Sequence, residues 1–426
     1  MIMPADRVQR SFGTSPHVLL VASGYHLYRE YLLRMVAASA QIWLFTDAPP
    51  TWEHPYIVGH TVVDTLDAAA MIEAARELRT QAPLHGVVCW NEAKMVQTAR
   101  LAEALGLPGG DPEAVGRCRD KHRTRIALAQ AGIGQAASVA VVTLEEARAA
   151  AERIGYPVVL KPRSLGASLG VGLVGCAVEL EAAFERARCA HGVPSFRAGV
   201  LVEEYLQGPE ISVDAACHNG VLTPLFVARK VSGFPPYFEE TGHSVDGRDP
   251  LLHDTELLEV MQGAHRAVGY RDGITHTEIM LTEQGPKIIE INARLGGDLI
   301  PYVGYLATGI DPGRVAVDVA CGVTPRVGEP RPGVAAVRFL YPECDVVAGD
   351  VEIDAAQLPP SVHAVGALAA PGQALLLPPK GNVACRYAYA IAVADSLGHC
   401  QSALDVASRA TCLRIERHLA EELTVA

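Results

Sequence analysis

The chain has 426 residues, a formal net charge of −12 at pH 7 and a hydrophobic fraction of 49%. A chain of this length is too long to fold around one hydrophobic core, so we expect roughly two to four domains. The acidic balance argues against a nucleic-acid-binding scaffold, which needs a basic face, and no apolar run of about 18 residues suggests a membrane span.

The first third of the chain alternates short apolar runs with helix-like segments. Strands that alternate with helices predict a parallel, doubly wound sheet, so we expect an α/β, Rossmann-like domain over 1–107. The expected strands are 17–23, 41–47 and 85–92, and the expected helices are Tyr28–Ala38, Ala68–Arg79, Ala93–Leu105 and, beyond the segment GLPGGDP, Asp120–Gln130.

A second pattern begins at GYPVVLKP, after a helix expected at Ala147–Ile154. Mostly strands follow, which predicts an α+β region over 108–327 with a smaller lobe at about 133–206. A Pro/Gly-rich junction, GEPRPGV, opens a last α+β domain over 328–426, which mixes short strands with one closing helix at Gln401–Leu419. The strands of the central region are expected at Val158–Lys161, Val171–Val174, Val200–Glu204, Glu210–His218, Leu222–Lys230, Ile274–Leu281 and Lys287–Asn292.

Cysteine usage and the opening residues bear on the compartment. The ten cysteines are scattered without a Cys-x-x-Cys pair, which indicates reduced thiols rather than disulfides or a zinc site. The opening residues MIMPADRVQRSFGTSPH contain no apolar segment typical of a signal peptide. We therefore expect a cytoplasmic protein with no nucleic-acid or membrane partner.

The segment VVLKPRSLGASLGVGLV places Lys161 at the end of a strand, before a loop rich in Ser and Gly. Exposed backbone amides in such loops bind anions, and a lysine adds a point charge, so the segment favours phosphate binding over a solvated surface hairpin. Matches to a dinucleotide fingerprint at 170–175 and to a nucleophile elbow at 166–170 lack the strand and helix that those motifs need.

A second motif joins Glu278, in THTEIML, to Glu290 and Asn292, in KIIEINARLGG, through the turn EQG. A three-residue hairpin loop would pair residues 282/286, 280/288 and 278/290, so that the two glutamates face each other. Two carboxylates and an amide oxygen suit Mg²⁺, whereas a solvated edge pair is the alternative reading. Arg294 follows in a glycine-rich turn, where its fork can reach a phosphate or a carboxylate.

Between these motifs lies VLVEEYLQGPEISVD, in which Gly208-Pro209 separates two strands. A strand-to-strand hinge presents backbone groups that can bind a purine edge, and Glu210 can accept hydrogen bonds from a ribose diol. Without other support, an ordinary hairpin is the simpler interpretation.

Taken together and in this order, these segments and RDKHRTRIAL resemble the ATP-grasp superfamily of carboxylate–amine ligases. The resemblance implies an ATP-grasp fold, with a Rossmann-like N-terminal domain, a two-lobed nucleotide-binding region and a closing C-terminal domain. It also implies ATP and two Mg²⁺ ions as cofactors, with Mn²⁺ as a substitute.

Carried over by position, the resemblance assigns roles to individual residues. The nucleotide would be bound by Lys121 and Lys161, by Ser164, Gly166 and Ser168 of the loop Ser164–Gly170, by Glu203, Glu204 and Leu206 at the adenine, and by Glu210 at the ribose. The metal ligands would be Glu278 and Glu290 with Asn292 close by, and Arg294 would steady the transferred phosphate.

The segments NARLGGDLIP and FEETGHSVDG are similar to the L-amino-acid ligase (dipeptide synthetase) branch, in which Glu240 and His243 would line an amino-acid pocket. His243 is expected in a loop. Val245-Asp246 stand where the branch has a proline, which leaves the substrate open. The aromatic residues Phe234, Tyr237 and Phe238 belong either to the pocket or to the core.

The implied activity is ATP-dependent amide formation between a carboxylate, such as that of an amino acid, and an amine. An acyl phosphate would be the intermediate, and ADP and phosphate would be released. A carboxylase that acts on bicarbonate and a non-catalytic ATP-binding subunit are the alternatives, and a homodimer is compatible with this reading.

Overall fold

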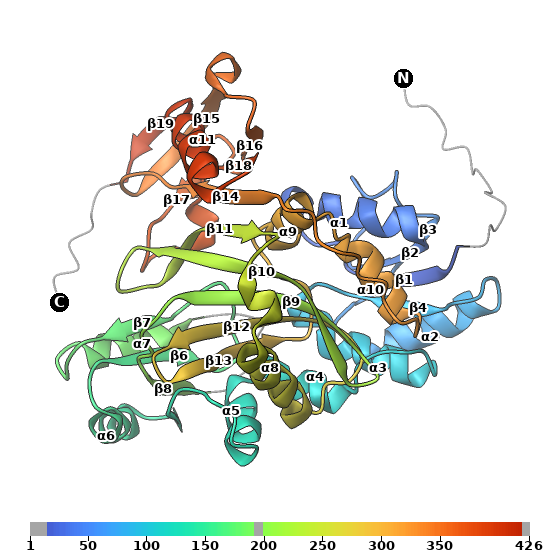
Figure 1. The fold of residues 1–426 in the computed structure, drawn as a ribbon, viewed down its shortest axis with the longest axis horizontal. Helices are drawn as coiled ribbons and strands as arrows, with labels where there is room; N and C mark the ends of the chain where they lie inside the picture. The colour runs from blue at the N-terminus through green and yellow to red at the C-terminus, as the bar shows by residue number, and fades with distance from the viewer. Residues whose placement is uncertain (1–14, 191–198, 420–426) are drawn as a thin grey trace.

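The computed structural model describes residues 15–190 and 199–419 (Figure 1). Over these residues the strands form four sheets. In Figure 1 the N-terminal sheet (blue) lies on the right and a small antiparallel sheet (green) lies at the lower left, with the largest sheet between them.

The N-terminal sheet has the strand order β3-β2-β1-β4, and every neighbouring pair is parallel. Its central strand is buried throughout because helices cover both faces of a doubly wound sheet. The expected Rossmann-like α/β arrangement is therefore confirmed. The elements are β1 His17–Val21, α1 His26–Ser39, β2 Gln41–Thr46, β3 Gly59–Val62, α2 Ala68–Arg79, β4 Gly86–Val88, η1 Glu92–Lys94 and α3 Met95–Ala104.

Two short helices, α4 Pro112–Arg119 and α5 Lys121–Gln130, link this sheet to the rest of the chain. The sequence analysis missed α4 because GLPGGDP reads as a connector. In the structure Asp111 caps α4, and Pro112 occupies its first turn, where a missing backbone N–H costs nothing.

The small lobe contains an antiparallel sheet of strand order β5-β8-β6-β7. Its apolar side chains form a cluster of their own, drawn from residues 141–202. The elements are β5 Ser138–Val141, α6 Leu144–Ile154, β6 Val158–Pro162, β7 Gly172–Val174, α7 Leu180–Cys189 and β8 Val200–Glu204.

The largest sheet has the order β13-β12-β9-β10-β11-β14-β18-β16. The boundary expected between 327 and 328 falls within the connection from β11 to β14, which are neighbours in this sheet, and the three-domain division stays a prediction. The elements are β9 Glu210–His218, β10 Val221–Gly233, β11 Glu239–Asp246, η2 Pro250–His253, α8 Thr255–Val268, β12 Gly273–Thr282, β13 Gly285–Asn292, α9 Ile300–Thr308, α10 Pro312–Ala320, β14 Val334–Leu340, β16 Val362–Ala367 and β18 Ala388–Ala394.

The closing helix is shorter than expected. Helix α11, Leu397–Arg409, ends where its buried stripe stops at Ala407, and the expected continuation to Leu419 is wrong. Residues Thr411–His418 form β19 instead, because they pair with β15, Val346–Ile353, far back in the chain. The remaining elements are η3 Ala355–Gln357, β17 Ala374–Leu375 and η4 Val383–Cys385.

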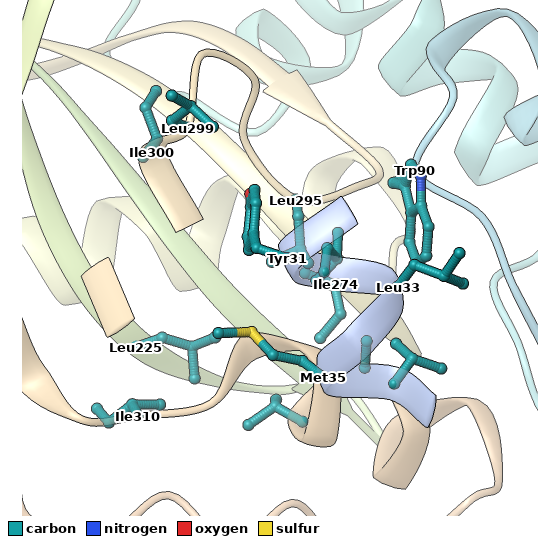
Figure 2. Close-up of a cluster of buried hydrophobic side chains, with 14 of the residues drawn as sticks. Tyr31, Leu33, Met35, Trp90, Leu225, Ile274, Leu295, Leu299, Ile300 and Ile310 are labelled. Carbon is teal, nitrogen blue, oxygen red and sulfur yellow. The ribbon is translucent and has the colours of Figure 1, made fainter. Parts of the chain in front are cut away.

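Helix α1 joins the N-terminal sheet to the largest sheet through the most extensive apolar cluster of the described residues. Figure 2 shows Tyr31, Leu33 and Met35 of α1 among side chains from the largest sheet and its helices, with Met35 directed at Leu225. Burial of this cluster fixes the N-terminal region against the strands that carry the predicted site.

The helices and the cysteines bear on the environment expected for the chain. None of the helices in the described part of the chain is long and apolar enough to cross a bilayer. All ten cysteines lie in this part, and none of them forms a disulfide there.

Candidate functional site

One pocket, between the small lobe and the β13 end of the largest sheet, gathers most of the predicted site residues. Three of the chain's six lysines line it, namely Lys121, Lys161 and Lys230. Ser164 and His243 are not among its lining residues. The predicted residues that line it are Lys121, Lys161, Gly166, Ser168, Glu203, Glu204, Leu206, Glu210, Glu240, Glu278, Glu290, Asn292 and Arg294.

Glu278 and Glu290 face each other across β12 and β13, as predicted. The other two expected pairs are wrong, because the turn is tighter: Thr282 pairs with Gly285 rather than with residue 286. A bulge next to Ile279 leaves Ile289 without a paired residue in β12, and this extra residue brings the two glutamates opposite each other.

Two lysines, whose side chains are 6% and 8% exposed, neutralise this pair of acids. Lys121 Nζ lies 2.9 Å from Glu290 Oε1, and Lys230 Nζ lies 3.2 Å from Glu278 Oε2. Like charges at facing positions destabilise a sheet unless cations lie beside them. With Asn292 buried next to them, these hard oxygen donors fit a divalent ion such as Mg²⁺.

Lys161 is anchored by a carboxylate of β8. Its Nζ lies 2.6 Å from Glu203 Oε2, and Arg125 binds the same carboxylate at 2.7 and 3.1 Å. Burial alone would raise the pKa of Glu203, but Arg125 and Lys161 hold it well below its usual range. Burial in turn lowers the pKa of Lys161 despite its acidic partner. The side chain of Glu203 thus pairs with two cationic side chains. Arg125 was not among the residues predicted from the sequence.

Hydrogen bonds anchor the loop after β6 at two points beside the pocket. Lys121 Nζ donates to Leu165 O at 2.6 Å, and Ser168 Oγ donates to Phe238 O at 3.0 Å. Ala167 and Ser168 both have positive φ, at 55° and 52°, a conformation that non-glycine residues rarely adopt. The hydroxyl of Ser164 is buried without a hydrogen-bond partner. The chain therefore covers the pocket with a tightly turned segment.

Lys230 joins three acidic side chains that the sequence analysis assigned to different roles. Its ammonium group contacts Glu210 and lies 3.1 Å from Glu240 and 3.2 Å from Glu278. Burial opposes the charge, but the three carboxylates raise the pKa of Lys230 well above its ordinary value. The rarity of lysine in this chain is the signal that would have singled out this residue.

The guanidinium of Arg294 reaches a carboxylate, one of the two partners expected for it. That carboxylate is Glu92, in η1 of the N-terminal region, which Arg119 also approaches at 3.6 Å. Burial alone would raise the pKa of Glu92, but Arg294 and Arg119 lower it. The sequence analysis missed Glu92, which links the N-terminal region to the pocket.

His243 lies in β11 and not in a loop, which corrects the expectation. The segment GHSV pairs with β14, about a hundred residues later, and this distant pairing leaves no local signal. The side chain of His243 is 0% exposed, and its Nε2 lies 3.2 Å from Glu240 Oε2 and 3.6 Å from Asp298 Oδ2.

The three aromatic residues of the β10–β11 connection have different surroundings. Phe238 lines the pocket. Phe234 packs on Tyr341, with 4.9 Å between ring centroids, and Tyr237 lies under Arg186 at 5.0 Å. The connection therefore contacts both the small lobe and the C-terminal region.

Two family models match this chain. An ATP-grasp domain covers residues 154–302, and an ATP-grasp N-terminal domain covers residues 36–109. The chain belongs to the ATP-grasp superfamily. The first match spans the β6 loop, the hinge and both metal-ligand candidates, and the expected superfamily and fold are thus confirmed.

Individual relatives include amino-acid ligases, and a solved structure shares the fold. The alanine–anticapsin ligase of Bacillus subtilis (strain 168) is 32% identical over 54% of this chain and 52% of its own length. Carnosine synthase 1 of Gallus gallus is 30% identical over 79% of this chain and 39% of its own length. This ATP-grasp chain thus spans about half the length of the first relative. The crystal structure of an L-amino acid ligase from Bacillus licheniformis has the same fold, with a TM-score of 0.79 at 22% identity, over 96% of this chain and 100% of that one.

Proposed function

We propose that this ATP-grasp protein is an ADP-forming carboxylate–amine ligase that joins an amino-acid carboxylate to an amine. The observation that carries the proposal is one pocket lined by two facing carboxylates, Glu278 and Glu290, and by three lysines. An acid pair beside cationic side chains is the arrangement that phosphoryl transfer from a metal-bound nucleotide requires.

In the first step a substrate carboxylate oxygen attacks the γ-phosphorus of ATP, and ADP leaves with the electron pair of the broken P–O bond. Lys121 and Lys161 bind phosphate oxygens, and the loop after β6 excludes water from the acyl phosphate. Mg²⁺, held by Glu278 and Glu290 with Asn292 beside them, would supply charge stabilisation at the phosphoryl oxygens.

In the second step an amine attacks the acyl carbon, and phosphate leaves. Arg294 would stabilise the oxyanion of the tetrahedral intermediate, where a positioned cation contributes most. Glu240 would bind the ammonium group of the amino acid. Because His243 is fully buried behind Glu240, we assign it a positioning role. We also propose a cytoplasmic location, where the ten cysteines would stay reduced.

A phosphate-release screen tests the proposal. MgATP is supplied with pairs of amino acids and with other small acids and amines, in bicarbonate-free buffer. We expect release that requires both an amino acid and an amine. Release that appears only when bicarbonate is added would favour the carboxylase alternative, and nucleotide binding without turnover would favour a regulatory subunit.

A further inference from the structure

Beside the nucleotide pocket, Glu240 and Asp298 converge on His243. One nitrogen of His243 and one oxygen of each carboxylate lie within 4.8 Å of one another. The two acidic side chains remain 17% and 19% exposed, whereas the imidazole is 0% exposed. A ligand that enters this cluster therefore meets the two carboxylates first and the imidazole behind them.

Both ring nitrogens of His243 are buried without a hydrogen-bond partner. The imidazole lies close to both acids, but no hydrogen bond joins it to either of them. A buried polar group without a partner costs free energy, so such groups in folded proteins are normally satisfied by a protein group, a water or a ligand. A small polar ligand between the acids would satisfy the nitrogen that faces them.

Asp298 is fixed by Arg386, which lies in the C-terminal region between η4 and β18. Arg386 donates to both carboxylate oxygens, Nη1 to Oδ1 at 2.9 Å and Nη2 to Oδ2 at 2.7 Å. Its Nη2 also donates to Glu240 O at 2.7 Å, and its Nε donates to Tyr341 OH at 2.8 Å. The guanidinium carbon lies 3.7 Å from the ring centroid of Phe339. The buried guanidinium group of Arg386 therefore positions both Asp298 and the backbone of Glu240.

The backbone of Asp298 points to the same conclusion. Asp298 and Leu299 both adopt left-handed conformations, with φ of 48° and 63°. Non-glycine residues in this region cost free energy and persist where surrounding contacts hold them, often at ligand sites. The contacts of Arg386 to Asp298 are of that kind.

We propose that Asp298, positioned by Arg386, is the second carboxylate of an ammonium-binding pair that it forms with Glu240. The ligand is the α-ammonium group of the amino-acid substrate, so this inference rests on the proposed function. An ammonium group has three N–H donors and no acceptor, so it can form hydrogen bonds to both carboxylates.

A divalent metal ion fits the cluster less well. Arg386 already occupies both oxygens of Asp298, and Lys230 lies 3.1 Å from Glu240. A dipositive ion would meet two resident cations at close range, whereas a monovalent ammonium group adds half that charge and forms hydrogen bonds with the lone pairs that remain.

The test measures binding to the full chain in the presence of MgADP. Saturation-transfer NMR with a mixture of the proteinogenic L-amino acids first selects the amino acid that binds best. Calorimetry then gives the Kd of this amino acid and of the same acid without its amino group. The ratio of the two Kd values isolates the contribution of the ammonium group to binding. If Asp298 had only a structural role, its substitution would leave this ratio unchanged.

We expect Asp298→Asn to weaken binding of the amino acid about 10-fold or more, because a charge-assisted contact is lost, and to leave the deaminated acid and MgADP within about 2-fold. Arg386→Lys should shift the Kd ratio in the same direction, because lysine keeps the positive charge but cannot form the paired hydrogen bonds of a guanidinium group. The control is Arg338→Lys, in β14, whose partner is Asp405, and it should leave the ratio unchanged.

Three results would overturn the proposal. One is an unchanged ratio in Asp298→Asn, which decides the matter even if Arg386→Lys does not fold. Another is a wild-type protein that binds MgADP but no amino acid. The last is loss of a bound Mn²⁺ ion in Asp298→Asn with unchanged amino-acid affinity. Phosphate release tests the ligase activity separately, so the two claims fail independently.

Discussion

Lys161 places a positive charge at the pocket. Its ammonium group is buried, and its partner Glu203 is shared with Arg125. Because Arg125 still neutralises Glu203 when the lysine is removed, a substitution at Lys161 should affect ligand binding more than folding.

We therefore expect Lys161→Met to weaken MgATP binding about 10-fold or more, because the phosphates lose a charge-assisted contact of about 1.5–3 kcal/mol. The circular dichroism spectrum should not change. Lys380→Met, in the exposed pair with Asp345, should bind MgATP like the wild type. Equal affinity in Lys161→Met, measured by calorimetry, would mean that the loop after β6 is an ordinary surface hairpin.

His276 gives the site a pH-dependent stability. Burial alone would lower its pKa, but Asp214, 2.6 Å away, raises the pKa to about 9 in the folded protein. The stabilisation is complete below the ordinary histidine pKa of about 6.5 and is lost as the pH rises through about 9.

The melting temperature of the wild type should therefore exceed that of His276→Asn most clearly near pH 6, and the difference should shrink between about pH 6.5 and pH 9. A difference that stays constant across this range would show that the imidazole is not held in its charged form.

Among the elements, the hinge between β8 and β9 is tightly constrained. Gly208 has φ of 147°, and a Cβ built there would lie 2.0 Å from Leu281 O, so alanine cannot fit without movement of the backbone. This contact ties the hinge to β12, which carries Glu278.

Gly208→Ala should lower the free energy of unfolding by about 1–3 kcal/mol and weaken MgATP binding, because strain at the hinge shifts the strands that line the pocket. Gly398→Ala, in α11, where an added Cβ has open space, should not destabilise the protein. Denaturant unfolding of both variants makes the comparison. Equal stability of Gly208→Ala and the wild type would contradict the strained geometry.

The sequence predicts local features of these elements well and distant pairings poorly. The parallel N-terminal strands and the facing of Glu278 and Glu290 follow from apolar runs and from a short hairpin. His243 was expected in a loop because its strand is completed by β14, about a hundred residues later. The end of α11 was missed for a similar reason, since β19 forms only through its pairing with β15. Asp298 and Arg386 meet across 88 residues, and no local pattern indicates such a contact.

At the scale of the whole molecule, the small lobe and the region around α1 have separate apolar clusters, so we expect them to open as separate cooperative parts. The cluster around α1 unites the N-terminal sheet with the largest sheet, whereas the small lobe has a cluster of its own from residues 141–202.

Hydrogen exchange followed by mass spectrometry should therefore show the strands of the small lobe opening at lower free energy than the strands β1, β9 and β12, which should exchange together. MgADP should slow exchange in the small lobe most. Identical protection in both parts would contradict this division.

The central claim is that the pocket makes an acyl phosphate from an amino acid. The most direct measurement supplies MgATP, the amino acid selected by the phosphate-release screen and a high concentration of hydroxylamine, and then identifies both products. We expect an amino-acid hydroxamate together with ADP and phosphate in equal amounts. A hydroxamate that forms with AMP and pyrophosphate would mean an adenylate intermediate and would contradict it.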